Sequence, residues 1–205
     1  ASATAIIHWL AIPVFADVEK ETGSLDPKSI SKLMSTKNYF LLEFGTAQFS
    51  RIELPDDDLT KARKNWGDAL VSISTTFEDQ GAGAAIEIAG NIIDSLYGYK
   101  FDPVMFKPTL ATGERTFRPT RDGCLSYFVG HNSDYPDDSG FGIKGWRSVS
   151  SETSNSLVYG DMALWMGWVI LTDKNGNITK VDKSWGYKLD DVGNLRITLH
   201  HSSLP

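Results

Sequence analysis

The sequence predicts an α+β fold in which one curved antiparallel sheet wraps over a layer of helices. Three observations predict it. Helical periodicity is confined to residues 58–98, extended patterns dominate from residue 141 onward, and tight turns separate the extended segments. Helices followed by a run of strands are typical of chains in which the two kinds of element segregate. With 205 residues, the chain is long enough to bury a sizeable core.

Two parts follow each other along the chain. We expect residues 1–60 to form a helical or irregular extension packed on the main domain, which comprises residues 61–205. The apolar stretch at residues 3–16 is shorter than the roughly 20 residues of a membrane-spanning helix. It also lacks the basic flank of a secretory signal, so we expect a helix or arm docked on the core.

Two antiparallel helices open the main domain. Asp58 and Thr60 are both suitable N-caps for the first helix, and the segment Asp-Gln-Gly-Ala-Gly at residues 79–83 breaks it. Gly98 closes the second helix. Apolar residues three and four apart define the buried faces: Ala62, Trp66, Ala69, Leu70, Ile73 and Phe77 in the first helix, and Ala85, Ala89, Ile92, Ile93 and Leu96 in the second.

Extended segments follow these helices. Residues 102–111 are short and extended, pinned by prolines, and residues 119–131 suit one or two helical turns. The strand patterns cover residues 141–149, 156–173, 178–188 and 195–203. The Asn-Gly pair within residues 173–177 predicts a tight hairpin, and residues 190–194 predict a slightly longer one.

Charge and cysteine content exclude several classes of protein. The net charge is −6, the pI is about 5.2, and lysines and arginines form no block. Nucleic acids and anionic membranes both attract a concentrated basic surface, so we expect neither as a main partner. Cys124 is the one cysteine, so the fold has no internal disulfide and does not depend on an oxidising compartment.

Residues 162–171 are apolar on both faces of the predicted strand. One face can cover the helices, and the other needs cover as well. We therefore predict a homodimer formed through the outer face of the sheet.

The residue types present argue against a metal site. The four histidines are His8, His131, His200 and His201. Successive side chains of a strand point to opposite faces, so His200 and His201 cannot chelate one ion together. A zinc site would need one of them with His131 and a distant carboxylate. We expect no metal and no cofactor.

Other catalytic motifs are equally absent from the sequence. It contains no Gly-X-Ser-X-Gly, and Ser202 or Ser203 beside a histidine is not a triad. The glycines at residues 81–83 are better explained by a turn between helices than by a phosphate cradle.

The last strand carries the strongest chemical signal, His-His-Ser-Ser at residues 200–203. Such a polar stripe either faces solvent at a sheet edge or lines a concave pocket. From the residues alone both readings stay open. Strict alternation divides the strand into one face with Arg196, Thr198, His200 and Ser202, and another with Ile197, Leu199, His201 and Ser203.

Four segments resemble the iota-class carbonic anhydrases: residues 106–111 (FKPTLA), 127–130 (YFVG), 171–188 and above all 195–205 (LRITLHHSSLP). The resemblance runs from about Trp66 to the C-terminus. It implies a cone-shaped SnoaL/NTF2-like fold and reversible hydration of carbon dioxide, a lyase reaction, with carbon dioxide and bicarbonate as ligands. Algal and cyanobacterial members work without a metal, although some relatives have been linked to manganese. A plastid or a cyanobacterial cytoplasm is the implied location.

The resemblance also implies site residues. Its bicarbonate-binding hydroxyls fall on Thr109, Tyr127 and one serine of His-His-Ser-Ser, which also supplies the functional histidine. The polar face of the strand selects His200 and Ser202. A β-bulge near the strand end would instead select His201 and Ser203 as the substrate-binding pair. The apolar wall would come from Phe106, Phe128, Trp165 or Trp185.

These residues suggest a mechanism without a metal, and two other functions compete with it. The hydroxyls would hold water and the nascent bicarbonate as preorganised dipoles, while His200 orients them and accepts the proton. An isomerase or cyclase of the same fold would use Asp161 as its base inside a roomy apolar pocket. An association or small-molecule-binding module would need no catalysis at all.

Overall fold

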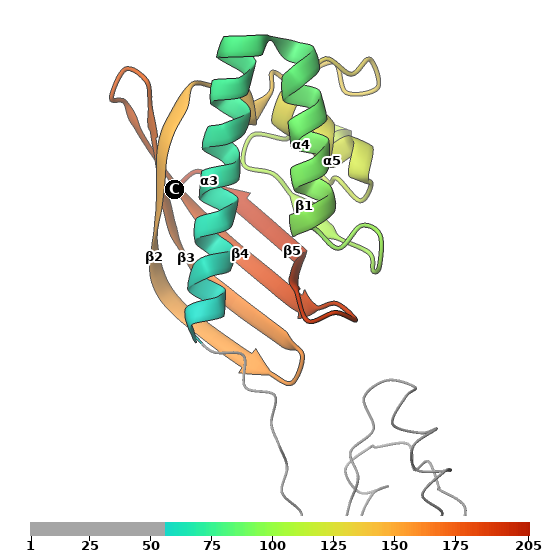
Figure 1. Cartoon of the computed structure of the whole chain (residues 1–205), viewed down its shortest axis with the longest axis vertical. Helices are drawn as coiled ribbons and strands as arrows, with labels where there is room; N and C mark the ends of the chain where they lie inside the picture. The colour runs from blue at the N-terminus through green and yellow to red at the C-terminus, as the bar shows by residue number, and fades with distance from the viewer. Residues whose placement is uncertain (1–55) are drawn as a thin grey trace, which may run out of the picture. The chain divides into compact units, whose positions relative to one another are not determined.

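Three helices lie against one face of a five-stranded sheet in the computed structural model, which describes residues 56–205 (Figure 1). The predicted extension, residues 1–60, lies outside the described residues apart from 56–60, which begin the first helix. The helices are α3 (Asp56–Gln80), α4 (Ala82–Leu96) and α5 (Arg121–Val129). The strands are β1 (Met105–Lys107), β2 (Trp146–Tyr159), β3 (Met162–Asp173), β4 (Ile178–Leu189) and β5 (Leu195–Ser203).

The sheet confirms the α+β class. Its strand order is β1-β5-β4-β3-β2, with β2 to β5 joined as successive antiparallel hairpins. β1, which belongs to the segment expected to be short and extended, pairs in parallel with β5 and sets Phe106 beside His200. This pairing brings residues almost a hundred positions apart in the chain to one edge of the sheet.

Two predicted strand boundaries were wrong. Residues 141–143 form a 3-10 turn, so β2 begins only at Trp146 and continues through the stretch that was expected to separate two strands. The hairpin turn lies instead at Gly160 and Asp161, where Tyr159 pairs with Met162. Gly160 has φ +60°, and glycine is favoured at the first position of such two-residue turns. Because the residues on both sides of the turn are apolar, the periodicity of the sequence did not indicate it.

The helical faces match the prediction, but the break between the helices is shorter than expected. Trp66, Leu70 and Ile73 of α3 are buried, as are Ala85, Ala89 and Ile93 of α4. Only Gly81 interrupts the helices, with φ +84°, a conformation that residues with a Cβ atom rarely adopt. At Gly67, an added Cβ would lie 2.9 Å from the Val149 Cβ atom, so glycine lets α3 pack closely on β2.

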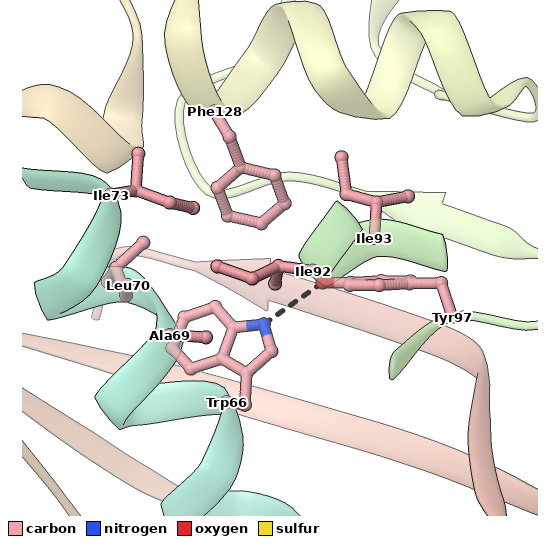
Figure 2. Close-up of a pocket in the computed structure, with 8 residues that line it drawn as sticks. All are labelled: Trp66, Ala69, Leu70, Ile73, Ile92, Ile93, Tyr97 and Phe128. Atoms are coloured by element: carbon pink, nitrogen blue, oxygen red, sulfur yellow. Dashed lines mark hydrogen bonds between the residues drawn. The ribbon is translucent and has the colours of Figure 1, made fainter. Parts of the chain in front are cut away.

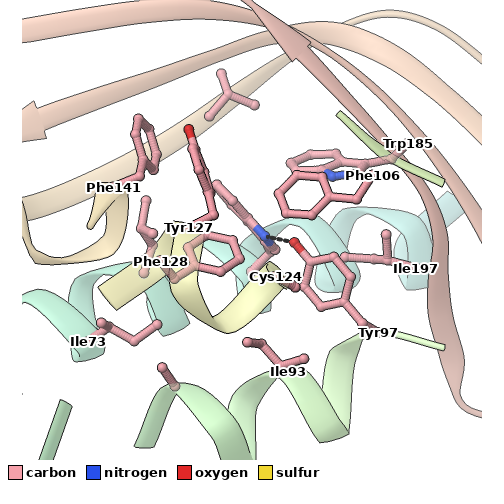
Figure 3. Close-up of a cluster of buried hydrophobic side chains, with 14 of the residues drawn as sticks. Ile73, Ile93, Tyr97, Phe106, Cys124, Tyr127, Phe128, Phe141, Trp185 and Ile197 are labelled. Carbon is pink, nitrogen blue, oxygen red and sulfur yellow. Dashed lines mark hydrogen bonds between the residues drawn. The ribbon is translucent and has the colours of Figure 1, made fainter. Parts of the chain in front are cut away.

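β3 separates the core from an exposed apolar stripe. Ala163, Trp165 and Val169 point into the core, while the alternate residues Met162, Leu164, Met166 and Trp168 remain partly exposed. The inner residues join the helices in one buried cluster, part of which is drawn in Figure 3.

Candidate active site

A β-bulge decides which side chains of β5 enter the core. Gly186 of β4 pairs with Leu199, and the next residue, Tyr187, pairs with Ile197, so Thr198 is the extra residue. The predicted strict alternation was therefore wrong at this point, and Ile197 joins His200 in the core. Because the bulge lies before the motif rather than at the strand end, His200 and Ser202 point inward, with exposed fractions of 1% and 0%.

Protein groups bind both ring nitrogens of His200. Its Nδ1 lies 2.8 Å from the Tyr97 hydroxyl, which accepts a hydrogen bond from Trp66 Nε1 at 3.0 Å. Its Nε2 lies 2.8 Å from Lys183 Nζ. Burial, followed by the nearby Lys183 and His201, holds the pKa of His200 well below its ordinary value, so the imidazole is neutral.

Aromatic rings enclose this imidazole. Phe106 stacks on it with the ring centroids 4.5 Å apart, and Trp185 and Trp66 lie at 5.4 and 5.6 Å. Figure 3 shows Phe106 and Trp185 together in the buried cluster. Two of the predicted wall residues are thus beside His200. The others lie one ring further out, because Phe128 contacts Phe106 and Trp165 contacts Trp185.

A short chain of hydroxyl groups lies on the same inner face. Thr109 Oγ1 donates to Ser202 Oγ at 2.7 Å, and Ser202 Oγ donates to the Asp182 carbonyl at 2.9 Å. Since both hydroxyl hydrogens are engaged, the remaining lone pairs are what this chain offers a ligand. Thr109 is held there by the pairing of β1 with β5 and by Lys107, whose Nζ donates to the Ser202 carbonyl at 2.8 Å.

Tyr127 completes the hydroxyl group cluster. Its hydroxyl is buried and makes no hydrogen bond of acceptable geometry within the described residues. Burial raises the pKa of Tyr127, and the nearby Thr109 hydroxyl and the backbone of residues 109 and 110 partly oppose that rise. A buried hydroxyl without a partner is rare, and it marks a position where a ligand or water can bind. Tyr127 can donate there, whereas Thr109 and Ser202 can accept.

Lys183 is the residue that the sequence analysis missed. It is buried, with an exposed fraction of 2%, and it pairs with Ser202 across the two strands. A lysine between Asp182 and Ser184 resembles any solvated strand residue in the sequence. The inward alternation of Lys183, Trp185 and Tyr187 was the signal that could have found it.

The other candidates lie apart from this cluster. His201 is exposed, and Ser203 donates to the Asp182 carboxylate on the side of the strand away from Thr109. Asp161 is in the turn between β2 and β3. Among residues 56–205, no three histidine, cysteine or acidic side chains are placed to hold a metal ion. Nor does this part of the chain contain a helix long and apolar enough to cross a membrane.

Two pockets border α3, and neither is lined by Thr109, Tyr127 or Ser202. A small apolar pocket of about 10 Å³ lies between α3 and α4. It is beside the hydrogen-bonded Trp66 and Tyr97, which Figure 2 shows among the lining residues. That volume is close to the minimum that holds one water molecule. A larger pocket of about 240 Å³ is lined by Arg63, Ser150 and Trp185, among others. Asp161 lines neither pocket, so the arrangement required by an isomerase is missing from both.

Three comparisons with known proteins bear on this site. The family model described as metal-independent carbonic anhydrase matches residues 57–204. A metal-independent carbonic anhydrase from Nostoc sp. strain PCC 7120 is 49% identical over 152 residues, which are 74% of each chain. The crystal structure of a cyanobacterial iota-carbonic anhydrase complexed with bicarbonate is also 49% identical, with a TM-score of 0.73 over 74% of this chain and 93% of the other. A structure of an NTF2-like family protein from Streptomyces avermitilis aligns at 11% identity, with a TM-score of 0.47 over 73% of this chain and 94% of the other, and carries no argument about the site.

Proposed function

The chain belongs to the metal-independent carbonic anhydrase family, and we propose that it hydrates carbon dioxide reversibly at the cluster of Thr109, Tyr127 and Ser202. One observation carries the assignment of the site. Three buried hydroxyl groups from β5, α5 and the segment after β1 meet beside a neutral imidazole that is enclosed by aromatic rings. The proposed reaction rests on the similarity to the family's relatives, and the proposed site rests on this cluster.

The hydroxyl cluster is suited to orient a water molecule. A lone pair of Thr109 or Ser202 accepts one hydrogen of the water, which helps to direct a lone pair of the water oxygen at the carbon of carbon dioxide. The unpartnered Tyr127 hydroxyl then donates to the oxygen on which negative charge develops. Phe106 and Trp185 keep the surroundings dry, which strengthens each of these dipoles.

Stopped-flow measurement of carbon dioxide hydration tests this site. The protein is first treated with a chelator and its metal content measured. We expect activity to survive that treatment and to fall at least tenfold in Tyr127→Phe, the size of effect typical for loss of one preorganised donor. Tyr187→Phe is the matched control, because Tyr187 is also buried and its hydroxyl is also unpartnered within the described residues. Equal rates in the two variants would contradict the assignment.

We also propose that two copies associate through the outer face of the sheet. Met162, Leu164, Met166 and Trp168 form an exposed apolar stripe on β3, and their exposed fractions range from 36% to 57%. Such a stripe is costly to leave in water. Sedimentation of the wild type as a dimer and of Met166→Lys as a monomer would support this interface, and a monomeric wild type at micromolar concentration would contradict it.

An association module without catalysis is the weaker alternative. The same exposed stripe on β3 would serve it, but it gives no role to the buried hydroxyl groups. Hydration above the buffer rate separates the two functions.

A further inference from the structure

Lys183 is a buried amine with an unusual set of neighbours. Its Nζ lies 2.8 Å from His200 Nε2, 4.7 Å from the Trp66 ring centroid and 5.6 Å from that of Trp185. No carboxylate among the described residues forms an ion pair with it. A buried ammonium is normally paired, so a lysine enclosed by two indoles and an imidazole is favoured in its neutral form.

The surroundings of His200 leave it poorly suited to be the base. Tyr97 binds one ring nitrogen and Lys183 binds the other, so neither is free to contact a water molecule at the hydroxyl cluster. The lysine differs in this respect. In the His200 tautomer that carries its proton on Nδ1, Nε2 accepts one N–H of the amine, and the amine lone pair stays free. The strand pairing sets Lys183 directly across from Ser202.

We propose that the Lys183 amine receives the proton released when water adds to carbon dioxide, with His200 holding that amine in place. The inference rests on the proposed function. One O–H bond of the water breaks as its oxygen bonds to carbon. The proton is passed to Nζ, where a new N–H bond forms, and bicarbonate carries the negative charge. The resulting ammonium lies over the Trp66 ring, and its positive charge attracts the bicarbonate.

The charged groups around Lys183 shift its pKa in opposite directions. Burial lowers its pKa to about 7, the Asp182 carboxylate opposes that effect, and the positive charge of Lys107 on β1 adds to it. β5 contributes the neutral His200 and, on the far face, His201. α3 contributes the uncharged Trp66 beside Nζ and, further along the helix, Arg63 over the Trp165 ring. Above pH 7 the amine is mainly neutral and able to accept a proton, so the hydration rate is expected to rise through that pH.

The pH profile of kcat/KM for hydration, measured on the full chain, tests the proposal. We expect at least a tenfold loss in both Lys183→Met and Lys183→Arg, because a guanidinium keeps its proton and cannot accept another. Lys180→Met is the matched control, since Lys180 is exposed on the same strand and paired with Glu152. Activity retained in Lys183→Arg, or a rise through pH 7 that persists in Lys183→Met, would overturn the proposal.

A second measurement does not depend on turnover. In protein labelled with ¹³C at the lysine Cε atoms, we expect one resonance to titrate near pH 7, and that resonance to be absent from Lys183→Met and from Lys183→Arg. Either variant assigns it, so misfolding of one does not remove the test. A midpoint near that of an exposed lysine would overturn the inference. A wild type that titrates as expected but does not hydrate carbon dioxide would overturn the proposed function, and the inference with it.

Discussion

His200 and His201 are adjacent histidines in very different surroundings. The first is 1% exposed, and its two ring nitrogens are bound by Tyr97 and Lys183. The second is exposed on the opposite face of the same strand. Ser202 and Ser203 show the same contrast. The Ser202 hydroxyl is hydrogen-bonded to Thr109, and the Ser203 hydroxyl is hydrogen-bonded to the Asp182 carboxylate. Identical residue types therefore acquire different chemistry from the face on which they lie.

The largest expected effect is on stability, and it compares the two histidines. His200→Ala removes a packed ring and leaves the buried Tyr97 and Lys183 groups without their partner, which we expect to cost about 2–4 kcal/mol of unfolding free energy. His201→Ala should change it by less than about 0.5 kcal/mol, as for an ordinary surface residue. Urea unfolding of both variants measures the difference. Similar values would mean that the two faces are not distinguished as the structure indicates.

The next comparison is between the two serines and concerns activity. Ser202→Ala removes an acceptor from the hydroxyl cluster and should lower the hydration rate by roughly tenfold or more. Ser203→Ala should lower it by less than about twofold, because that hydroxyl faces away from Thr109. Stopped-flow assays on the two variants decide the matter. The reverse order of effects would favour the opposite face of β5 as the substrate-binding one.

The smallest expected effect is on how steeply the free energy of unfolding changes with pH. The pKa of Lys183 is lowered to about 7 in the folded protein, so at pH 7–8.5 the unfolded chain binds more protons and stability rises with pH. One such group contributes at most about 1.4 kcal/mol per pH unit. Lys183→Met should flatten the rise, which unfolding curves at several pH values would show. An unchanged slope would contradict a lowered pKa.

The limits of that pH window have physical causes. Below pH 7 the lowered pKa of His200 contributes a rise of its own. Above pH 8.5 the buried Cys124 thiol, whose pKa is raised, begins to oppose the trend because the unfolded chain loses that proton first. Lys183 is itself one cause of the lowered pKa of His200, so the two contributions are mixed below pH 7. Between pH 7 and 8.5 neither His200 nor Cys124 dominates, and there the difference between wild type and variant isolates the lysine.

Local patterns in the sequence were sufficient for the order of elements, the buried faces of α3 and α4, and the hairpin at residues 173–177. Each depends on neighbours within a turn or two of chain, which periodicity and an Asn-Gly pair report directly. The resemblance to a known family supplied Thr109 and Tyr127, which their own sequence context would not have distinguished from ordinary core residues.

Tertiary structure alone decided the rest. The bulge at Thr198 depends on how β5 pairs with Gly186 and Tyr187, and the parallel pairing of β1 with β5 joins segments far apart in the chain. Burial of Lys183 likewise follows from the helices that cover that face of the sheet. The register of strand pairing and the local dielectric environment both depend on contacts between packed layers. The donor and acceptor roles of these residues could therefore be assigned only from the tertiary structure.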